Sequence, residues 1–427
     1  MKSFYSLISL FYSTFFIINA QEVSTFAGSS KGYFDDIGIN AKFGEPNGIC
    51  AASNGNLYIV DTFNKKIRKV DILTNQVTTL AGSSSGYLDG IGTSAKFNGP
   101  TGICIDQYDN LYIADSGNNK IRKIVVSTGE VSTIAGSSFG FNNGIGTTAK
   151  FSIPVGICTD NNGFLYVADF GNNQIRKIEI STTNVTTLVG STSGYSDGFG
   201  TNALFNNPQG ICSDMKGNLY VTDSSNHKIR KINSSTAEVN TIAGSTQGFF
   251  DGIGALSQFN FPYDLCIDNN DNLFVTDNYN HKIRKINTKT NEVTTIAGSS
   301  LGYLDGIAST SQFKYPSGIC YNQENFYVSD QNNYIIRKIS NNLSIYNQEK
   351  LRFNIFPNPS TFLLNVEIDN ITSNTKLQIT DVLGKIIQNQ KLESSITKIN
   401  TSSFSKGIYF LKISDENKKS IRKFIVK

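Results

Sequence analysis

The sequence predicts an all-β fold, a six-bladed β-propeller followed by a small β-sandwich. The first observation is a repeat of 54 residues, marked in every copy by a glycine that follows Ala or Val. These glycines are Gly28, Gly82, Gly136, Gly190, Gly244 and Gly298. The second is the repeat itself, in which four β-rich runs (G-I-C-x-D, N-L-Y-V-A-D, K-I-R-K-I and V-T-T-I-A) are separated by Gly, Asn and Asp turn signals. Such periods are typical of solenoids, propellers and arrays, and four strands per repeat indicate propeller blades.

The copy number of the runs predicts how the ring closes. The N-L-Y-V-A-D run occurs six times, ending at Asp61, Asp115, Asp169, Asp223, Asp277 and Asp330. The V-T-T-I-A run also occurs six times, but its first copy, residues 23–28, precedes every other strand, and nothing like it follows Ile339. We therefore expect six blades over residues 21–345, with the N-terminal strand completing the last blade. Hydrogen bonds between the two chain ends leave no open seam.

Composition and the N-terminus narrow the class of protein. The net charge is +4 in 427 residues, and the Lys and Arg residues are spread through the repeats, which gives no case for nucleic acid as a partner. Residues 1–20 have one Lys, an apolar stretch too short to span a bilayer, and Ile18-Asn19-Ala20 before Gln21. This pattern predicts a secretory signal peptide cleaved after Ala20, and a mature protein without a transmembrane segment.

The 54-residue period stops after Tyr346, and residues 346–427 form a different β-rich segment. Alternating apolar residues and short turns predict a small antiparallel sandwich after a linker. The order P-N-P (residues 357–359), D-x-x-G-K (381–385), G-I-Y-x-x-K (407–412) and K-F-I-V-K (423–427) resembles the type A sorting domain of the type IX secretion system. The resemblance implies recognition by the secretion machinery of a Gram-negative bacterium, and a secreted or outer-surface location. An ordinary C-terminal β domain is the alternative.

The repeats also resemble a family. The segment P-x-G-I-C-x-D-x-x-G-N-L-Y-V-A-D-x-x-N-H-K-I-R-K-I is similar to an NHL repeat, and Asn226-His227 and Asn280-His281 retain the Asn-His pair of that name. The other blades have Asn64-Lys65, Asn118-Asn119, Asn172-Asn173 and Asn332-Asn333. The resemblance implies the propeller fold. NHL propellers include binding platforms, nucleic-acid binders and a few lyases, so the fold leaves the function open.

Six cysteines also recur every 54 residues, at Cys50, Cys104, Cys158, Cys212, Cys266 and Cys320. An even number in an exported protein usually indicates disulfides. Equivalent positions on neighbouring blades, however, should lie beyond the roughly 7 Å Cα separation that a disulfide tolerates. We expect free thiols that act as small buried hydrophobic residues between blades, with a metal or redox role as the alternative.

Two repeated sets of polar residues have structural interpretations. Each second strand ends in the Asp named above, and an Arg follows seven residues later, at Arg68, Arg122, Arg176, Arg230, Arg284 and Arg337. A tight turn between the strands should pair these charges, with ligand binding as the alternative. The two histidines occupy the same turn of adjacent blades, which favours a turn role over metal ligation. No G-x-S-x-G, H-E-x-x-H or paired C-x-x-C motif supports catalysis.

The connections between blades are the candidate binding elements, because loops of nearly twenty residues are long for a compact domain. We expect the six loops to crowd one face. Each has an aromatic residue, at Tyr33, Tyr87, Phe141, Tyr195, Phe249 or Tyr303, and an acid or amide two residues later, at Asp35, Asp89, Asn143, Asp197, Asp251 or Asp305. Such pairs suit stacking on sugars or gripping a peptide. Packing within the loops is the alternative interpretation.

Departures from the repeat mark where an asymmetric site is expected. Blade five has Tyr263-Asp264 at the start of its first strand, with Asp264 in place of the glycine of the other five blades. Near the end of the same strand, four blades carry an Asp, namely Asp106, Asp160, Asp214 and Asp268. If these acids faced the channel, they could hold a cation such as Ca²⁺, since clustered carboxylates need a counter-ion. The alternative is that they cap strand ends.

These observations together predict an exported binding or adhesion propeller. Its partner is a glycan, a peptide or a protein, bound through the inter-blade loops, and no cofactor is firmly implied beyond the possible Ca²⁺. The rival prediction is a metal-assisted lyase or hydrolase with its site in the central channel. Near-equivalent blades with exposed aromatic residues favour the binding propeller, whereas an enzyme should show one asymmetric ligand cluster at the axis.

Overall fold

The computed structural model describes residues 21–340, 353–368, 371–372, 374–382, 384–415 and 419–427. The predicted signal peptide and the predicted boundary at residues 345–346 lie outside these residues. The chain divides into two compact units, residues 1–342 and residues 343–427, and each is described by itself.

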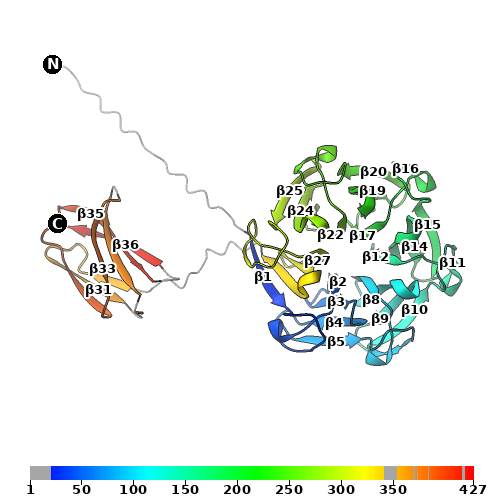
Figure 1. The fold of residues 1–427 in the computed structure, drawn as a ribbon, viewed down its shortest axis with the longest axis horizontal. Coiled ribbons are helices and arrows are strands. Elements are labelled where there is room, and N and C mark those ends of the chain that lie inside the picture. Colours follow the sequence, from blue (N-terminus) through cyan, green and yellow to red (C-terminus); the bar gives the residue numbers. More distant parts are fainter. Residues whose placement is uncertain (1–20, 341–352, 369–370, 373, 383, 416–418) are drawn as a thin grey trace, which may run out of the picture. The chain divides into compact units, whose positions relative to one another are not determined.

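The first unit is a ring of six antiparallel sheets, the blades of the predicted propeller (Figure 1). The innermost strand of every blade begins at a proline: β2 (Pro46–Ala51), β7 (Pro100–Ile105), β12 (Pro154–Thr159), β17 (Pro208–Ser213), β22 (Pro262–Ile267) and β27 (Pro316–Asn322). The second strands are β3 (Leu57–Asp61), β8 (Asn110–Asp115), β13 (Phe164–Asp169), β18 (Asn218–Asp223), β23 (Asn272–Asp277) and β28 (Asn325–Asp330). The third are β4 (Lys66–Val70), β9 (Lys120–Val125), β14 (Gln174–Glu179), β19 (Lys228–Asn233), β24 (Lys282–Asn287) and β29 (Ile335–Ser340).

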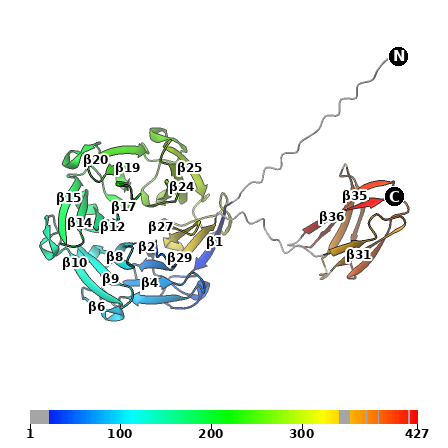
Figure 2. The ribbon, with the colours of Figure 1, turned by 180° about the vertical axis from the view of Figure 1, so that it is seen from behind.

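The fourth strand of the last blade comes from the N-terminal end of the described chain. β1 (Glu22–Ala27) pairs antiparallel with β29, with Glu22 opposite Ser340 and Val23 opposite Ile339. The other fourth strands are β5 (Val77–Ala81), β10 (Glu130–Ala135), β15 (Asn184–Gly190), β20 (Glu238–Ala243) and β25 (Glu292–Ala297). The ring is therefore closed as the sequence predicted, and Figure 2 shows β1 beside β29 from behind.

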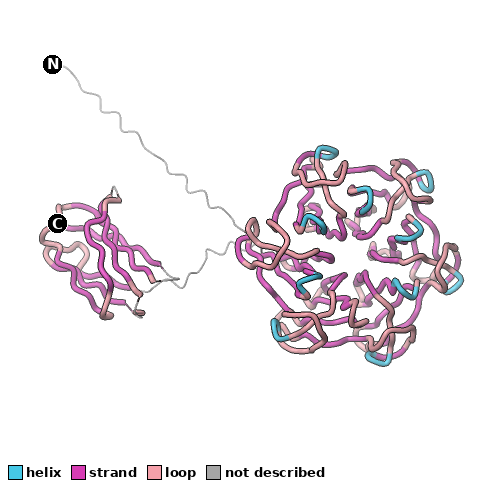
Figure 3. The backbone as a smooth tube through the Cα atoms, viewed as in Figure 1, coloured by secondary structure: helices cyan, strands magenta, loops and turns pink. Residues whose placement is uncertain are grey.

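A short fifth strand, which the sequence analysis did not predict, lies outside the fourth strand in five blades: β6 (Gly90–Ile91), β11 (Gly144–Ile145), β16 (Gly198–Phe199), β21 (Gly252–Ile253) and β26 (Gly306–Ile307). In blade one a single bridge between Ile37 and Gln76 takes its place. These pairings hold the inter-blade loops at the outer edge of the ring (Figure 3). The expectation that the loops crowd one face is wrong, because each loop is tied to the outermost strand of the next blade.

Single turns of 3₁₀ helix recur in two places (Figure 3). One set lies in the inter-blade loops: η1 (Gly38–Asn40), η2 (Gly92–Ser94), η4 (Gly146–Thr148), η6 (Gly200–Asn202) and η8 (Gly254–Leu256). The other joins the second and third strands: η3 (Ser116–Asn118), η5 (Phe170–Asn172), η7 (Ser224–Asn226), η9 (Asn278–Asn280) and η10 (Gln331–Asn333).

The hydrophobic core of the ring is divided into clusters between neighbouring blades. In one of them, Cys104 and Tyr112 of blade two pack with Phe151, Leu165 and Val167 of the next blade and its loop. The loop phenylalanine equivalent to Phe151 is fully buried in all six copies. Each blade therefore buries its apolar faces against two neighbours, and closing the ring completes the core.

The second unit is a two-sheet β-sandwich. One sheet has the order β30-β31-β34, with β30 (Phe353–Phe356), β31 (Leu363–Ile368) and β34 (Ile396–Asn400). The other has the order β33-β32-β35-β36, with β33 (Ile386–Lys391), β32 (Lys376–Asp381), β35 (Gly407–Ser414) and β36 (Lys419–Val426). Buried residues from both sheets, including Leu364, Leu411 and Phe424, form its own core. The sandwich predicted for the tail is confirmed.

Candidate functional site

Every blade holds a buried ion pair between its second and third strands. In blade two, Arg122 Nη1 donates to Asp115 Oδ2 at 2.8 Å, and neither side chain is exposed. The equivalent pairs of the other blades have distances between 2.6 and 2.9 Å. The predicted pairing is confirmed, with full burial of both partners. Desolvation raises the pKa of Asp115, because its cost exceeds the stabilisation from Arg122 and the hydrogen bonds.

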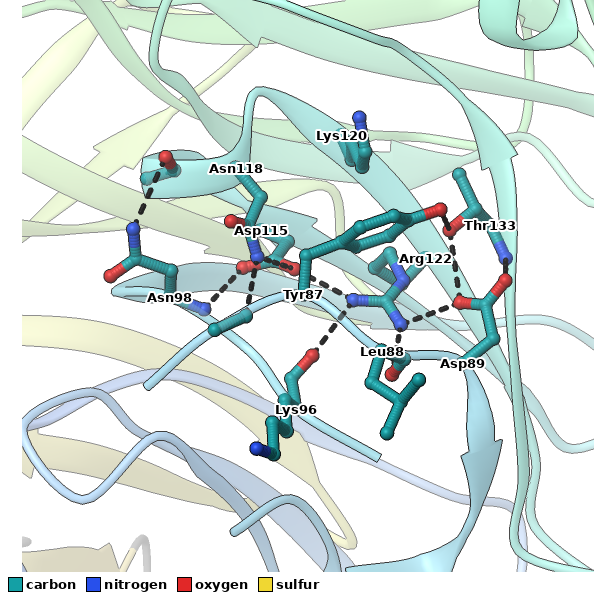
Figure 4. A network of polar contacts seen from close by, with 12 residues as sticks. Tyr87, Leu88, Asp89, Lys96, Asn98, Asp115, Asn118, Lys120, Arg122 and Thr133 are labelled. Carbon is teal, nitrogen blue, oxygen red and sulfur yellow. Dashed lines mark hydrogen bonds and ion pairs between the residues drawn. The ribbon is translucent and has the colours of Figure 1, made fainter. Parts of the chain in front are cut away.

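The same arginine fixes the inter-blade loop that precedes its blade. Arg122 donates to the carbonyl oxygens of Lys96 and Leu88 at 3.1 and 2.9 Å, and to Asp89 Oδ1 at 2.6 Å (Figure 4). One guanidinium therefore joins a second-strand carboxylate, two loop carbonyls and a loop carboxylate. Its planar arrangement of N–H donors suits this role, which a lysine could not reproduce.

The loop acids predicted to face a ligand are engaged within the fold. Asp89 Oδ2 accepts from the backbone N–H of Thr133 at 3.1 Å, and Asp89 Oδ1 accepts from the Thr133 hydroxyl at 3.0 Å, besides the Arg122 contact. The same three contacts recur at Asp35, Asp197, Asp251 and Asp305. In blade three Asn143 accepts from its arginine. These contacts favour the alternative, packing within the fold, because a neighbouring guanidinium and strand N–H groups occupy the carboxylate oxygens; ligand binding by these acids stays a prediction.

The aromatic partners of these acids cover the same arginines. The Tyr87 ring lies 5.0 Å from the Arg122 guanidinium and 4.7 Å from Lys120 Nζ, between the two cations (Figure 4). The rings of Tyr33, Tyr195 and Phe249 have the same two neighbours. Phe141 and Tyr303 contact the arginine, but Gln174 and Ile335 stand where the other blades have the lysine. Phe141 and Tyr303 are therefore the two predicted rings that have no lysine against them, although all six rings keep a similar exposure, 47 to 55%.

Exposed apolar residues of the loops form a second set that the sequence analysis missed. The residue two positions after the loop acid or amide is large and apolar in every loop, 53 to 65% exposed: Ile37, Ile91, Ile145, Phe199, Ile253 and Ile307. Four loops add Phe34, Leu88, Phe250 or Leu304, which are 47 to 57% exposed. The sequence signal was an apolar residue repeated beside glycine in a turn, where packing does not require one.

The central channel holds a cavity of about 40 Å³ where the inner strands begin. Its wall includes the strand glycines Gly48, Gly102, Gly156 and Gly210. A Cβ at Gly102 would lie 2.0 Å from the Val155 carbonyl oxygen of the next blade, so the inner strands approach too closely for any side chain there. The glycines repeated at this position are thus explained by the narrowness of the ring.

Blade five breaks this rule at Asp264, whose carboxylate lines the cavity. Its Oδ2 accepts from the backbone N–H of Ile319 at 3.2 Å. Tyr263, the preceding residue, reaches across the channel, and its hydroxyl accepts from Asn47 Nδ2 at 3.0 Å. Burial raises the pKa of Asp264 to about 7. The predicted pair at the channel mouth is therefore brought together in one asymmetric cavity.

The four acids proposed to hold a channel cation are not brought together. Asp106 Oδ1 accepts from the backbone N–H groups of Tyr108 and Asn110 at 2.9 Å, within the turn between β7 and β8. Asp160, Asp214 and Asp268 make the equivalent contacts in their own turns. The structure corrects their placement, because each carboxylate folds back on its own turn. Among the described residues there is no group of three or more His, Cys, Asp or Glu that could hold a metal ion. Calcium binding stays a prediction.

The six cysteines are free thiols, as predicted. Four are buried and two, Cys212 and Cys266, are intermediate. Burial raises the pKa of each thiol well above its usual value, which keeps the sulfur protonated. The contacts of Cys104 with apolar residues of the next blade agree with a packing role.

Comparison with known proteins identifies both units. Residues 97–124, 151–178, 205–232 and 259–286 match the NHL repeat, and residues 354–427 match the secretion system C-terminal sorting domain. The propeller is built of NHL repeats, and the tail is a secretion sorting domain. The two resemblances seen in the sequence are thereby confirmed.

Relatives of the NHL propeller share part of their length with this chain. Protein SUPPRESSOR OF QUENCHING 1, chloroplastic, of Arabidopsis thaliana is 32% identical over 284 residues, which are 62% of this chain and 26% of that protein. NHL repeat-containing protein 2 of Homo sapiens is 29% identical over 317 residues, which are 65% of this chain and 44% of that protein. The chain thus spans less than half the length of these relatives.

The fold of the propeller is also seen in solved structures. A Bacteroides thetaiotaomicron protein of unknown function has a TM-score of 0.59 and 23% identity, over 75% of this chain and 76% of its own. An auxiliary nutrient binding protein of the same organism has a TM-score of 0.57 and 18% identity, with the same coverage. At these identities the similarity establishes the fold alone.

The Asn-His pair of the NHL repeat has a turn role in this chain. His227 has a left-handed backbone conformation, with φ at 56°, and its Nδ1 accepts from the backbone N–H of Phe261 at 3.2 Å. His281 makes the equivalent contact with Tyr315, at 3.3 Å. In other blades the Oδ1 atoms of Asn119 and Asn173 accept from the residue 34 positions later. The histidines are therefore turn residues, as predicted, and burial lowers the pKa of both.

The sorting domain explains where the protein acts. This domain marks proteins exported by type IX secretion to the cell surface or beyond it, so the chain is an exported protein handled by that machinery. Within the domain, Asn358 of the P-N-P motif accepts from the backbone N–H of Ile425 at 3.0 Å, which ties the motif to the terminal strand β36. No helix among the described residues is long and apolar enough to cross a membrane.

Proposed function

We propose that this exported NHL propeller is a binding or adhesion module that recognises a protein or peptide through the outer edge of its ring. The observation that carries the proposal is the apolar residue exposed in every inter-blade loop, from Ile37 to Ile307. Neighbouring exposed apolar residues mark sites of protein interaction, whereas single ones need no explanation. Four of the six loops expose two such residues three positions apart, as at Leu88 and Ile91, and the first or second of them recurs on every blade.

The shape of these side chains favours a protein or peptide over a glycan. Sugar recognition relies on open aromatic faces, and in four loops the predicted ring has an arginine and a lysine against it. Isoleucine, which stands at five of these six loop positions, offers a branched apolar surface that suits another apolar side chain. The glycan interpretation would depend on Phe141 and Tyr303.

The loops can present such residues because they are rigidly held. Arg122 and Asp89 join the loop to the third and fourth strands of its blade, and equivalent contacts hold the other loops. A loop fixed before binding loses little conformational entropy on binding. The contacts found for the predicted acids therefore support binding indirectly, by positioning their neighbours. The metal-assisted lyase or hydrolase in the channel stays an untested alternative.

The test compares two variants of the exported chain. In the loop variant, Ile37, Ile91, Ile145, Phe199, Ile253 and Ile307 are changed to Ser. In the control, Leu73 and Tyr108, which are 91 and 76% exposed outside these loops, are changed to Ser. Both proteins and the wild type are screened against arrays of extracellular proteins, peptides and glycans. A protein or peptide ligand lost by the loop variant and kept by the control supports the proposal.

Two results would contradict it. A protein ligand retained by the loop variant would place binding elsewhere on the propeller. A glycan ligand lost on changing Phe141 and Tyr303 to Ala would assign the edge to sugar recognition instead. The substitutions lie at exposed positions, so the variants should fold, which circular dichroism and thermal melting can check.

A further inference from the structure

The cavity at the channel mouth contains a charge that the repeat does not require. Five blades have glycine where blade five has Asp264, and those glycines are needed for close packing of the inner strands. At Gly210, an added Cβ would lie 2.5 Å from Asp264 Cα and 2.7 Å from its Oδ1. The acid thus occupies a crowded position that the other five blades fill with glycine.

This carboxylate has hydrogen bonds but no opposite charge. It accepts from the backbone N–H groups of Leu265 and Ile319, and within the described residues it forms no ion pair. The fully buried acids of the ring, such as Asp115, are each paired with an arginine, whereas Asp264 is half-buried and faces the cavity. A partly desolvated carboxylate without a cation carries a cost that binding a cation would relieve.

The rest of the wall is rich in neutral acceptors. Besides Asp264, the polar side chains of the cavity belong to Asn47, Thr101, Gln209 and Tyr263, from four different blades. Asn47 uses its amide N–H on Tyr263, which leaves the amide oxygen without a donor in the described structure. One carboxylate and several neutral oxygens match a single positive charge that carries several N–H donors.

We propose that the channel mouth binds the ammonium group of a small primary amine, with Asp264 as its counter-charge. The cavity volume of about 40 Å³ fits a group of this size, since one water-sized site needs roughly 10–15 Å³. A divalent metal ion usually takes more than one anionic ligand, and the cavity offers one. The proposal is independent of the protein or peptide bound at the outer edge.

The ionisation of Asp264 gives the binding a pH dependence. Its pKa of about 7 means that a fraction of the carboxyl is protonated near neutral pH, and the amine requires the ionised form. The titratable groups around it are Tyr263 and the thiols of Cys158, Cys212, Cys266 and Cys320. Burial raises the pKa of all of them, so they stay neutral. Amine affinity should therefore fall as the pH drops below about 7, and its pH dependence should be that of a single titrating group.

The experiment is calorimetric titration of the exported chain with n-butylammonium chloride. Parallel titrations use n-butanol, the neutral analogue, and CaCl₂. The variants are Asp264→Asn, which keeps the shape, and Asp264→Gly, which restores the residue of the other five blades. Asp106→Asn, in a turn outside the cavity, is the matched control. We expect the wild type and the control to bind the amine, and both Asp264 variants to bind it at least about tenfold more weakly.

Each contrary result overturns the inference. Equal amine affinity in the wild type and Asp264→Asn would remove the carboxylate from the site, and binding of n-butanol as strong as that of the amine would show an apolar pocket. Tighter binding of Ca²⁺ than of the amine, abolished by Asp264→Asn, would assign the site to a metal ion. If none of the three probes produced heat on titration, the cavity would bind none of them and the inference would fail. Asp264→Gly follows the repeat and relieves a partly buried charge, so it should fold even if Asp264→Asn does not.

Discussion

At the scale of single residues, the buried arginine of the third strand organises each blade. Arg122 contacts one acid of its own blade, one acid of the preceding loop and two loop carbonyls, and its guanidinium lies between the rings of Tyr87 and Phe97. The sequence predicted the pairing with Asp115 from the constant spacing of seven residues. It did not predict the contact with Asp89, because 33 residues separate the two in the chain.

Removing this arginine should destabilise the propeller. Arg122→Ala leaves Asp115 and Asp89 without their cation, and loss of one partner from a buried pair costs about 3–5 kcal/mol. Urea unfolding of the wild type and the variant would measure the difference. Lys123→Ala, at the neighbouring third-strand lysine, is the control and should change the free energy of unfolding by less than about 1 kcal/mol. An equal effect of the two substitutions would show that the buried pair adds nothing.

The two histidines should make stability depend on pH. Burial lowers the pKa of His227 and His281 in the folded state, so protonation favours the unfolded chain. The stability they support is complete above the unfolded pKa of about 6.5 and decreases as the pH falls below it. The double variant His227→Asn, His281→Asn keeps an acceptor, as at Asn119, and should lose less Tm than the wild type between about pH 7.5 and 5.5. The acids whose pKa is raised are the same in both proteins, so their effect on Tm cancels when the two pH dependences are compared.

At the scale of elements, the closeness of the inner strands decides what the channel can hold. β7 and β12 approach so closely that Gly102 has no room for a Cβ. The sequence showed a repeated glycine, but its reason is a contact between blades 54 residues apart. The fifth strands were missed for a related cause, since a two-residue strand such as β6 has no periodicity to detect and exists only by pairing with β10.

Adding one methyl group at this contact should be costly. Gly102→Ala would place Cβ 2.0 Å from the Val155 carbonyl oxygen, a backbone atom that cannot turn aside. We expect a loss of about 1–3 kcal/mol in the free energy of unfolding. Gly90→Ala is the matched control, because its nearest neighbour would lie at 3.5 Å, an ordinary contact. Chemical denaturation of the two variants would decide, and a neutral Gly102→Ala would mean that the inner strands can separate.

At the scale of the whole molecule, a closed ring and an export tail have separate roles. The ring is completed by β1, which brings Val23 into the core beside Ile339. The tail has its own core, built from residues such as Leu364 and Phe424. Both proposed binding sites, at the outer edge and at the channel mouth, therefore belong to the ring, and delivery to the outside of the cell depends on the tail.

Truncation should separate these roles. A chain that ends at residue 345 keeps every described strand of the propeller and should unfold at the same temperature as the propeller transition of the full chain. In a bacterium with type IX secretion the truncated chain should be retained in the cell, on the inner side of the outer membrane, because it lacks the sorting domain. Calorimetry and immunoblots of cell fractions and medium would check both parts. Appearance of the truncated chain in the medium would show that the tail is dispensable for export.

The repeat alone determined the six blades, the closing strand, the free cysteines and the buried ion pairs, because each depends on spacing that is visible along the chain. Tertiary structure alone decided what the loop residues do: Tyr87 and Asp89 turn inward to Arg122, and Ile91 is left outside. The 54-residue period cannot show which side chains point inward and which point outward, since all three positions are similarly constant between the repeats. Only the position of a buried guanidinium from another element fixes which side chains are used within the fold and which stay exposed.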